Sequence, residues 1–172
     1  MHDAARPAPW NGTSQAGGKA AFYRDLAEEL DALLTGETDA TANAANAAAA
    51  IYHSLPRLNW AGFYFLRGET LVLGPFQGRP ACVRIKPGSG VCGTAVRERR
   101  SILVPDVEAF PGHIACDTAS RSELVVPLFA DGRIMGVLDL DSPDLARFDA
   151  EDQAGCEALA GIVVRHLARS VL

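Results

Sequence analysis

Three of the four cysteines lie in one stretch of the chain, residues 81–123, together with its densest cluster of glycines. Cys82, Cys92 and Cys116 form no C-x-x-C pair, and this spacing favours neither a zinc ribbon nor a thioredoxin-type redox pair. Two interpretations of the three thiols stay open. Free cysteine is most often a small buried apolar residue, whereas thiols placed close together can also run a dithiol redox cycle.

The three thiols are predicted to have different surroundings. Cys116 lies in a segment without periodicity, residues 108–122, and long irregular loops inside a domain are usually functional. Cys82 is expected in a short strand and therefore to be harder to reach. Cys92 follows a glycine-rich turn at residues 88–90, and the helix that starts there is expected to lower the pKa of its thiol. The free N–H groups of the same turn can hold an anion.

Acidic side chains form a second candidate feature. Asp139 and Asp141 are two residues apart on a predicted strand, so both project to the same face. If that face is enclosed, their repulsion raises at least one pKa; a solvated strand end is the alternative. Glu123 starts the partner strand, where a plain two-residue turn places it opposite Leu140. It joins the two aspartates only if Pro127 causes a bulge, or if Glu123 belongs to the preceding loop.

Aromatic residues alternate along the first predicted strand. Trp60, Gly62 and Tyr64 share one face, and we expect the two rings to form a wall with room for a small group over the glycine. The alternative is that both rings belong to the core. His113, three residues before Cys116, can act as a general base or as a cation that steadies a thiolate, although a loop histidine is more often solvated.

These side chains must be positioned by the elements that the hydrophobic pattern predicts. Helices are expected over residues 19–34, 38–53, 91–98 and 148–167, and strands over 59–66, 70–75, 82–85, 101–104, 124–130 and 133–140. This order predicts an α+β fold, a mostly antiparallel central sheet of about five or six strands with helices packed on it. Thr38 is the expected N-cap of the second helix, and Asp131-Gly132 favours a type I′ hairpin turn. Cys156 is expected to pack as an apolar residue of the last helix.

Length and composition restrict the class of protein. The 172 residues predict a single domain, 19–172, after a flexible N-terminal tail, 1–18. A net charge of −5 provides no field that attracts nucleic acid or an anionic membrane, and no apolar run approaches the roughly 18 residues of a membrane span. Since the N-terminus has no export signal, we expect a cytoplasmic protein, in which a transient disulfide is favoured over a permanent one.

Seven motifs in order carry a family resemblance: NWAGFYFL, LVLGPFQG, ACVRI, GVCGTAV, GHIACD, SELVVPL and GVLDLDS. Together they resemble the free methionine-(R)-sulfoxide reductases, a GAF-domain enzyme family. The resemblance covers about residues 38–167. Ordinary GAF modules share the fold but not these three cysteines together with this acidic set.

The resemblance implies a GAF domain that reduces free, not protein-bound, methionine (R)-sulfoxide through thiols and is recycled by thioredoxin. It also implies a role in the repair of oxidative damage, no metal and no cofactor, and a homodimer is expected. By motif, Cys116 matches the cysteine that attacks the sulfoxide, Cys82 the principal resolving cysteine and Cys92 a second one. The positions that match the substrate pocket are Trp60, Tyr64, Glu123, Asp139 and Asp141.

Two other classes of protein are alternatives to the enzyme. A non-catalytic GAF-type sensor of a small ligand would share the fold, but it has no need for three placed thiols beside an acidic cluster. Thiol titration with methionine sulfoxide separates the two, because a sensor loses no thiol. A structural metal protein is disfavoured, since the cysteine spacing does not match zinc ligation.

Overall fold

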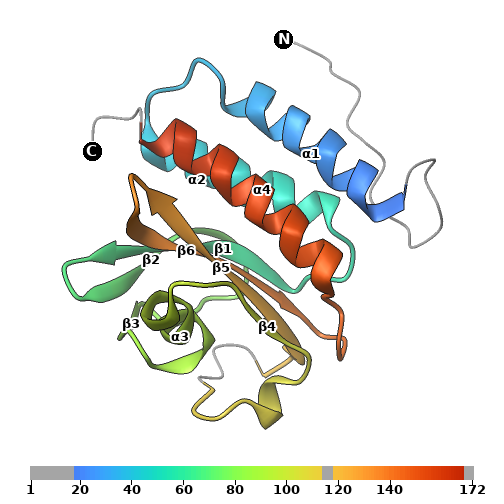
Figure 1. Ribbon diagram of the computed structural model, residues 1–172, viewed down its shortest axis with the longest axis vertical. Coiled ribbons are helices and arrows are strands. Elements are labelled where there is room, and N and C mark those ends of the chain that lie inside the picture. Colours follow the sequence, from blue (N-terminus) through green and yellow to red (C-terminus); the bar gives the residue numbers. More distant parts are fainter. Residues whose placement is uncertain (1–17, 114–117, 169–172) are drawn as a thin grey trace.

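One antiparallel sheet of six strands lies at the centre of the described chain, residues 18–113 and 118–168 of a computed structural model (Figure 1). The strands are β1 (Trp60–Arg67), β2 (Thr70–Gly78), β3 (Arg84–Ile85), β4 (Ile102–Val104), β5 (Ser122–Ala130) and β6 (Arg133–Ser142). They follow the order β3-β2-β1-β6-β5-β4, and every neighbouring pair is antiparallel. The predicted α+β architecture is therefore confirmed.

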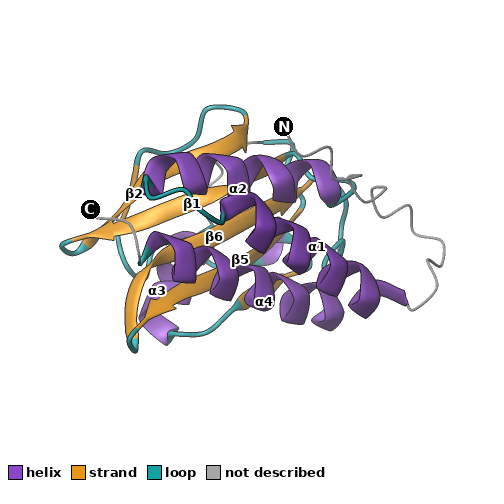
Figure 2. Ribbon diagram, turned by 90° about the horizontal axis from the view of Figure 1, so that it is seen from above, coloured by secondary structure: helices purple, strands orange, loops and turns teal. Residues whose placement is uncertain are grey.

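Helices cover the two faces of this sheet unequally. Three of them, α1 (Gly18–Leu34), α2 (Ala40–Ser54) and α4 (Ala150–Leu167), lie over one face, as the view from above shows (Figure 2). The short helix α3 (Gly90–Glu98) lies on the opposite face (Figure 1). A 3₁₀ turn, Val107–Ala109, follows β4. In the part of the chain that the structure describes, no helix combines the length and apolarity that a membrane crossing requires.

Alternation along the strands divides the interior into two cores. Successive side chains of a strand point to opposite faces, so Leu138 and Leu140 of β6 join the core beneath α1, α2 and α4. Val137, on the same strand, joins the smaller core beneath α3, which also contains Trp60 and Cys92. Asp139 and Asp141 have the parity of Val137, and both carboxylates consequently lie on the α3 face.

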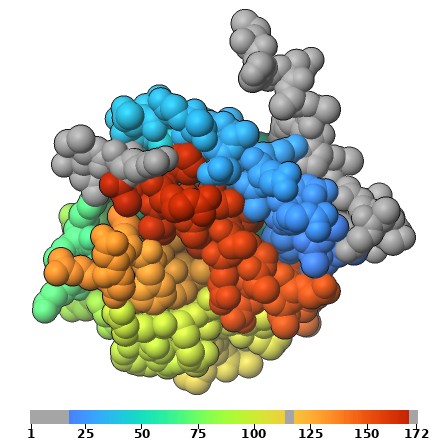
Figure 3. Space-filling model, turned by 45° about the horizontal axis from the view of Figure 1, so that its top comes forward, coloured from blue at the N-terminus to red at the C-terminus, as the bar shows by residue number. Residues whose placement is uncertain are grey.

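The first and last helices are joined by a buried polar contact. The Tyr23 hydroxyl of α1 donates to Asp152 Oδ1 of α4 at 2.8 Å, and Lys19 Nζ donates to the other oxygen at 2.8 Å. Figure 3 shows the two helices side by side at the surface, α1 in blue and α4 in red. Cys156 lies behind this contact with no exposed surface, as expected, and its burial raises the pKa of its thiol to about 12.

The hairpin of β5 and β6 turns as predicted. Asp131 (φ 49°) and Gly132 (φ 73°) both have the positive φ that a type I′ turn requires. The register then shifts between Leu128 and Phe129, which marks a β-bulge two residues from the turn. This bulge changes the residue that faces each later position of β6, and it decides where Glu123 lies.

Three local predictions need correction. Asp39, and not Thr38, caps α2, because its Oδ1 accepts from the Ala42 N–H at 2.8 Å. The strand predicted over 82–85 consists of Arg84–Ile85 alone, so Cys82 precedes it. The helix predicted over 148–167 begins at Ala150, because Asp149 is its N-cap. Of the predicted tail, residues 1–17 lie outside the described residues, while Gly18 already belongs to α1.

Candidate active site

All five residues predicted to line a substrate pocket lie around one cavity, between the sheet and α3. Its lining includes Trp60, Tyr64, Glu123, Asp139 and Asp141, together with Cys92. The cavity encloses about 530 Å³ of empty space, including its open mouth.

Strand register brings the acidic residues together. Asp141 of β6 lies between Trp60 of β1 and Glu123 of β5, each of which is its direct partner across the ladder. Asp139 is the next residue on the same face. A bulge is present, but it lies between Leu128 and Phe129 and not at Pro127, and it moves Glu123 from opposite Leu140 to opposite Asp141. Direct partners in a ladder lie within about 5.5 Å between Cβ atoms, so the three carboxyl groups form one cluster.

Burial makes this cluster hold protons more strongly. Only 6% of Glu123 and 7% of Asp139 are exposed. Burial raises the pKa of both carboxyl groups well above the ordinary range; the charge of Asp141 adds to the effect at Glu123, and that of Glu123 adds to it at Asp139. The solvated strand end is thereby excluded for Asp139. The cluster is chemically suited to deliver a proton near neutral pH.

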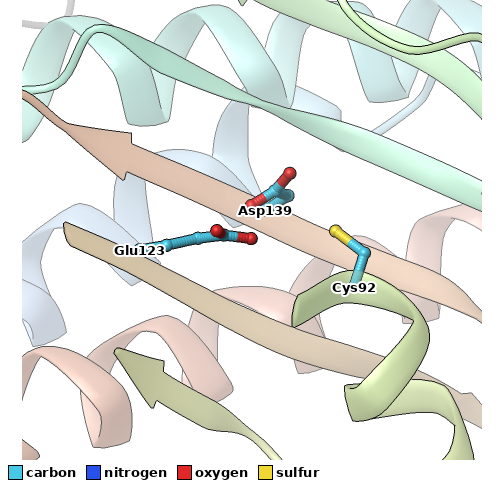
Figure 4. Close-up of side chains that lie close together, drawn as sticks. All are labelled: Cys92, Glu123 and Asp139. Atoms are coloured by element: carbon cyan, nitrogen blue, oxygen red, sulfur yellow. The ribbon is translucent and has the colours of Figure 1, made fainter. Parts of the chain in front are cut away.

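Cys92 lies in the first turn of α3 with its thiol toward Glu123 and Asp139, as the close-up shows (Figure 4). The prediction of a lowered thiol pKa is wrong. Burial raises the pKa of Cys92 well above its usual value, and the neighbouring Asp139 and Glu123 raise it further. The partial positive charge of a helix start is small, and here it is outweighed by desolvation and by two acidic neighbours. Cys92 is thus held as a thiol.

Aromatic rings form a wall beside the acidic cluster, since Trp60 of β1 is the direct ladder partner of Asp141. The Trp60 ring stacks on Tyr64, with ring centroids 5.9 Å apart, and on Phe76 of β2 at 5.2 Å. The prediction that Gly62 leaves room for a small group is wrong. A Cβ there would lie 2.3 Å from Phe76 Cβ and 2.8 Å from the Trp60 ring, so Phe76 and Trp60 already fill the space. The wall is therefore continuous.

The three cysteines of the sequence motifs differ in where they lie relative to the cavity. Cys116 lies outside the described residues. Cys82 is half-buried and disulfide-bonded, in the irregular segment between β2 and β3. Cys82 is next to Ala81, which lines the cavity, whereas Cys92 is itself one of the lining residues. Of the described cysteines, Cys92 and Cys156 are free.

Three cavity residues were not predicted as substrate contacts. Arg79 follows β2, and its carbonyl oxygen accepts from Trp60 Nε1 at 3.1 Å, which fixes the indole ring. Ser120 Oγ accepts from the Asn59 side chain at 2.9 Å. His113 Nε2 lies 3.6 Å from Glu123 Oε2. Because burial lowers the pKa of His113, its ring is uncharged near neutral pH. Of these three, only His113 was singled out from the sequence, by its closeness to Cys116.

Comparison with known proteins assigns this fold and site to a class. The GAF-domain family model matches residues 27–168, and the chain belongs to the GAF-domain family. Within it, the chain belongs with the free methionine-R-sulfoxide reductases. It is 51% identical over 150 residues to the free methionine-R-sulfoxide reductase of Escherichia coli, covering 87% of this chain and 91% of that one.

Two further relatives agree. The free methionine-R-sulfoxide reductase of Saccharomyces cerevisiae is 41% identical over 153 residues, which cover 84% of this chain and 85% of the yeast protein. The crystal structure of the free methionine-R-sulfoxide reductase from Neisseria meningitidis, in complex with its substrate, superimposes with a TM-score of 0.86. It is 45% identical and covers 92% of this chain and 95% of its own.

Proposed function

We propose that the protein reduces free L-methionine (R)-S-oxide to L-methionine through its cysteine thiols. The observation that carries this proposal is the enclosed cluster of Glu123, Asp139 and Asp141, which lines one cavity together with an aromatic wall and a thiol. The family to which the chain belongs supports the same reaction. A cavity with these walls has one side for a cation and one side for an apolar group.

The acidic cluster favours a free amino acid over a peptide. A free methionine sulfoxide carries an ammonium group, and a carboxylate of the cluster can hold that charge inside the cavity. Peptide-bound methionine sulfoxide has lost the ammonium group and would leave the buried acids without a partner, which is costly. The Trp60 ring, fixed by its hydrogen bond to the Arg79 carbonyl, offers an apolar wall to the S-methyl group.

The substrate carboxylate is assigned to the start of α3. Ser89, Gly90 and Val91 line the cavity where α3 begins, and the first N–H groups of a helix have no partner within the helix. Such a helix start favours an anion. The two charged ends of one zwitterion would thereby contact groups of opposite character, which fixes the direction in which the side chain enters.

The redox step is assigned to Cys116, whose thiolate attacks the sulfoxide sulfur. The sulfoxide oxygen passes to Cys116 as a sulfenic acid, methionine sulfur is reduced, and a carboxylic acid of the cluster supplies the proton that the oxygen needs. A second thiol, Cys82 or Cys92, then condenses with the sulfenic acid to a disulfide and releases water. Thioredoxin, a dithiol, reduces that disulfide and becomes oxidised itself. The raised thiol pKa of Cys92 favours Cys82 as the principal resolving residue.

The partners and location of the protein belong to the same proposal. We infer a homodimer in the cytoplasm that takes free methionine (R)-sulfoxide as substrate and thioredoxin as reductant. The net charge of −5 supports the expectation that neither nucleic acid nor an anionic membrane is a partner. Light scattering of the purified protein gives the oligomeric state.

Methionine release by cysteine variants tests the assignment. Cys116→Ser should abolish turnover of the free sulfoxide. Cys82→Ser should release one equivalent of methionine and then stop, because thioredoxin cannot restore the attacking thiol. Cys156→Ala is the matched control, since this thiol is buried under α1 and should leave repeated turnover intact. Turnover by Cys116→Ser at the wild-type rate would remove the attacking role from this residue.

A further inference from the structure

Three side chains from three separate elements present potential metal ligands to one point of the cavity. Cys92 comes from α3, Glu123 from β5 and Asp139 from β6, and Figure 4 shows them directed toward one another. One ligand atom of each, the sulfur and two carboxylate oxygens, lies within 4.8 Å of the other two. In a zinc site with Zn–S of about 2.3 Å and Zn–O of about 2.0–2.2 Å, such atoms approach one another a little more closely.

A second observation points to a ligand at this place. Asp139 is 93% buried, and its Oδ1 has no hydrogen-bond partner among the described residues, 18–113 and 118–168. A buried polar oxygen without a partner costs free energy and requires an explanation. Since Asp139 lines the cavity, a cation that enters it can supply the missing partner.

We propose that the reduced protein binds one Zn²⁺ through Cys92 Sγ, one oxygen of Glu123 and one oxygen of Asp139. One sulfur and two oxygens suit Zn²⁺, which accepts thiolate and carboxylate ligands alike, whereas Mg²⁺ and Ca²⁺ require oxygen alone. Binding of Zn²⁺ displaces the thiol proton of Cys92 into solvent, together with any proton held by Glu123 or Asp139, and involves no change of oxidation state. The fourth position of the metal faces the open cavity, where water can complete a tetrahedral set.

Zinc at this point acts as a competitor of the substrate and not as a resident cofactor. It occupies the carboxylates that the proposed mechanism assigns to the substrate ammonium and to proton delivery. This inhibitory consequence rests on the proposed function. The zinc site itself does not, because it follows from the placement of the three ligands.

Isothermal titration calorimetry with Zn²⁺ alone, on full-length protein reduced with a phosphine and freed of metal, tests the proposal. We expect one zinc per chain. Cys92→Ser and Asp139→Asn should each weaken zinc binding by at least about tenfold, since even groups one shell removed from a metal are worth about 10–100-fold in affinity. Cys156→Ala and Cys82→Ser are the controls and should bind as the wild type does.

The same titration identifies the result that would overturn the site. If Cys92→Ser binds zinc like the wild type, or if the loss follows Cys82→Ser instead, the ligand assignment is wrong. Far-ultraviolet circular dichroism verifies that each variant is folded, and if one of the two ligand variants is unfolded the other decides. A saturating concentration of L-methionine should raise the apparent Kd for zinc. This readout requires no turnover, so an inactive enzyme and an absent zinc site remain distinguishable.

Discussion

Gly62 gives the sharpest test of how the cavity wall is built. In Gly62→Ala, the added Cβ would lie 2.3 Å from Phe76 Cβ, 2.8 Å from Phe76 Cα and 2.8 Å from the Trp60 ring. Real Cβ atoms almost never approach this closely, and two of the three atoms cannot rotate away. The strand β2 must therefore move away from β1, or the Trp60 ring must move into the cavity.

The size of the effect follows from overpacking. Forcing a methyl group into a filled core costs about 1–3 kcal/mol, and for a chain of this length 1 kcal/mol corresponds to roughly 2–4 °C in Tm. We thus expect Gly62→Ala to lower the Tm by roughly 2–12 °C. A displaced Trp60 also narrows the cavity, so the KM for free methionine sulfoxide should rise.

Thermal unfolding followed by circular dichroism measures the change, and Gly161→Ala is the matched control. Gly161 is exposed on α4, and a Cβ added there meets no atom of the described residues within 4 Å. Alanine in mid-helix should stabilise the protein by about 0.5–1 kcal/mol. A Gly62→Ala variant with unchanged Tm and KM would show that the space over Gly62 is open, and the continuous wall would be refuted.

Three more predictions follow from buried groups. Asp139→Asn removes a carboxyl group whose pKa is raised by burial in the folded protein. In the unfolded wild type this carboxyl group ionises once the pH rises above about 4, so the stability of the variant relative to wild type should rise progressively between pH 4 and 8. Urea titrations measure this difference in unfolding free energy, and a difference that stays constant with pH would contradict the prediction. Tyr23→Phe removes the 2.8 Å donor to buried Asp152 and should cost about 1–3 kcal/mol of unfolding free energy, whereas Tyr52→Phe should stay within about 0.5 kcal/mol. The Cys92 thiol should be alkylated at pH 7 at least about tenfold more slowly in folded, reduced protein than in urea, because only thiolate reacts; equal rates by peptide mass spectrometry would contradict its burial.

The fold could be predicted because its signals are local. The Asp131-Gly132 dipeptide selects its turn within four residues, and the alternation of Leu138, Asp139 and Leu140 fixes which side chains face the helices. The cap of α2 was misjudged by one residue because Thr38 and Asp39 are both good caps, and only the hydrogen bond to Ala42 distinguishes them.

The chemistry of the site could be predicted only in part, because it depends on residues far apart in sequence. The place of Glu123 depended on a bulge between Leu128 and Phe129, whose position the sequence does not mark. The pKa of Cys92 depends on its burial and on carboxylates from two strands on the other side of the cavity, and these outweigh the local effect of the helix start. The space over Gly62 is filled by Phe76 from the next strand.

The most direct test of the proposed reductase is methionine release from four substrates, the R and S epimers of methionine sulfoxide, each free and peptide-bound, with thioredoxin supplied. The account predicts rapid, repeated release from the free R epimer alone, because the buried carboxylates require the substrate ammonium and the chain belongs with the free methionine-R-sulfoxide reductases. Comparable release from the peptide-bound R epimer, or none from the free one, would contradict it.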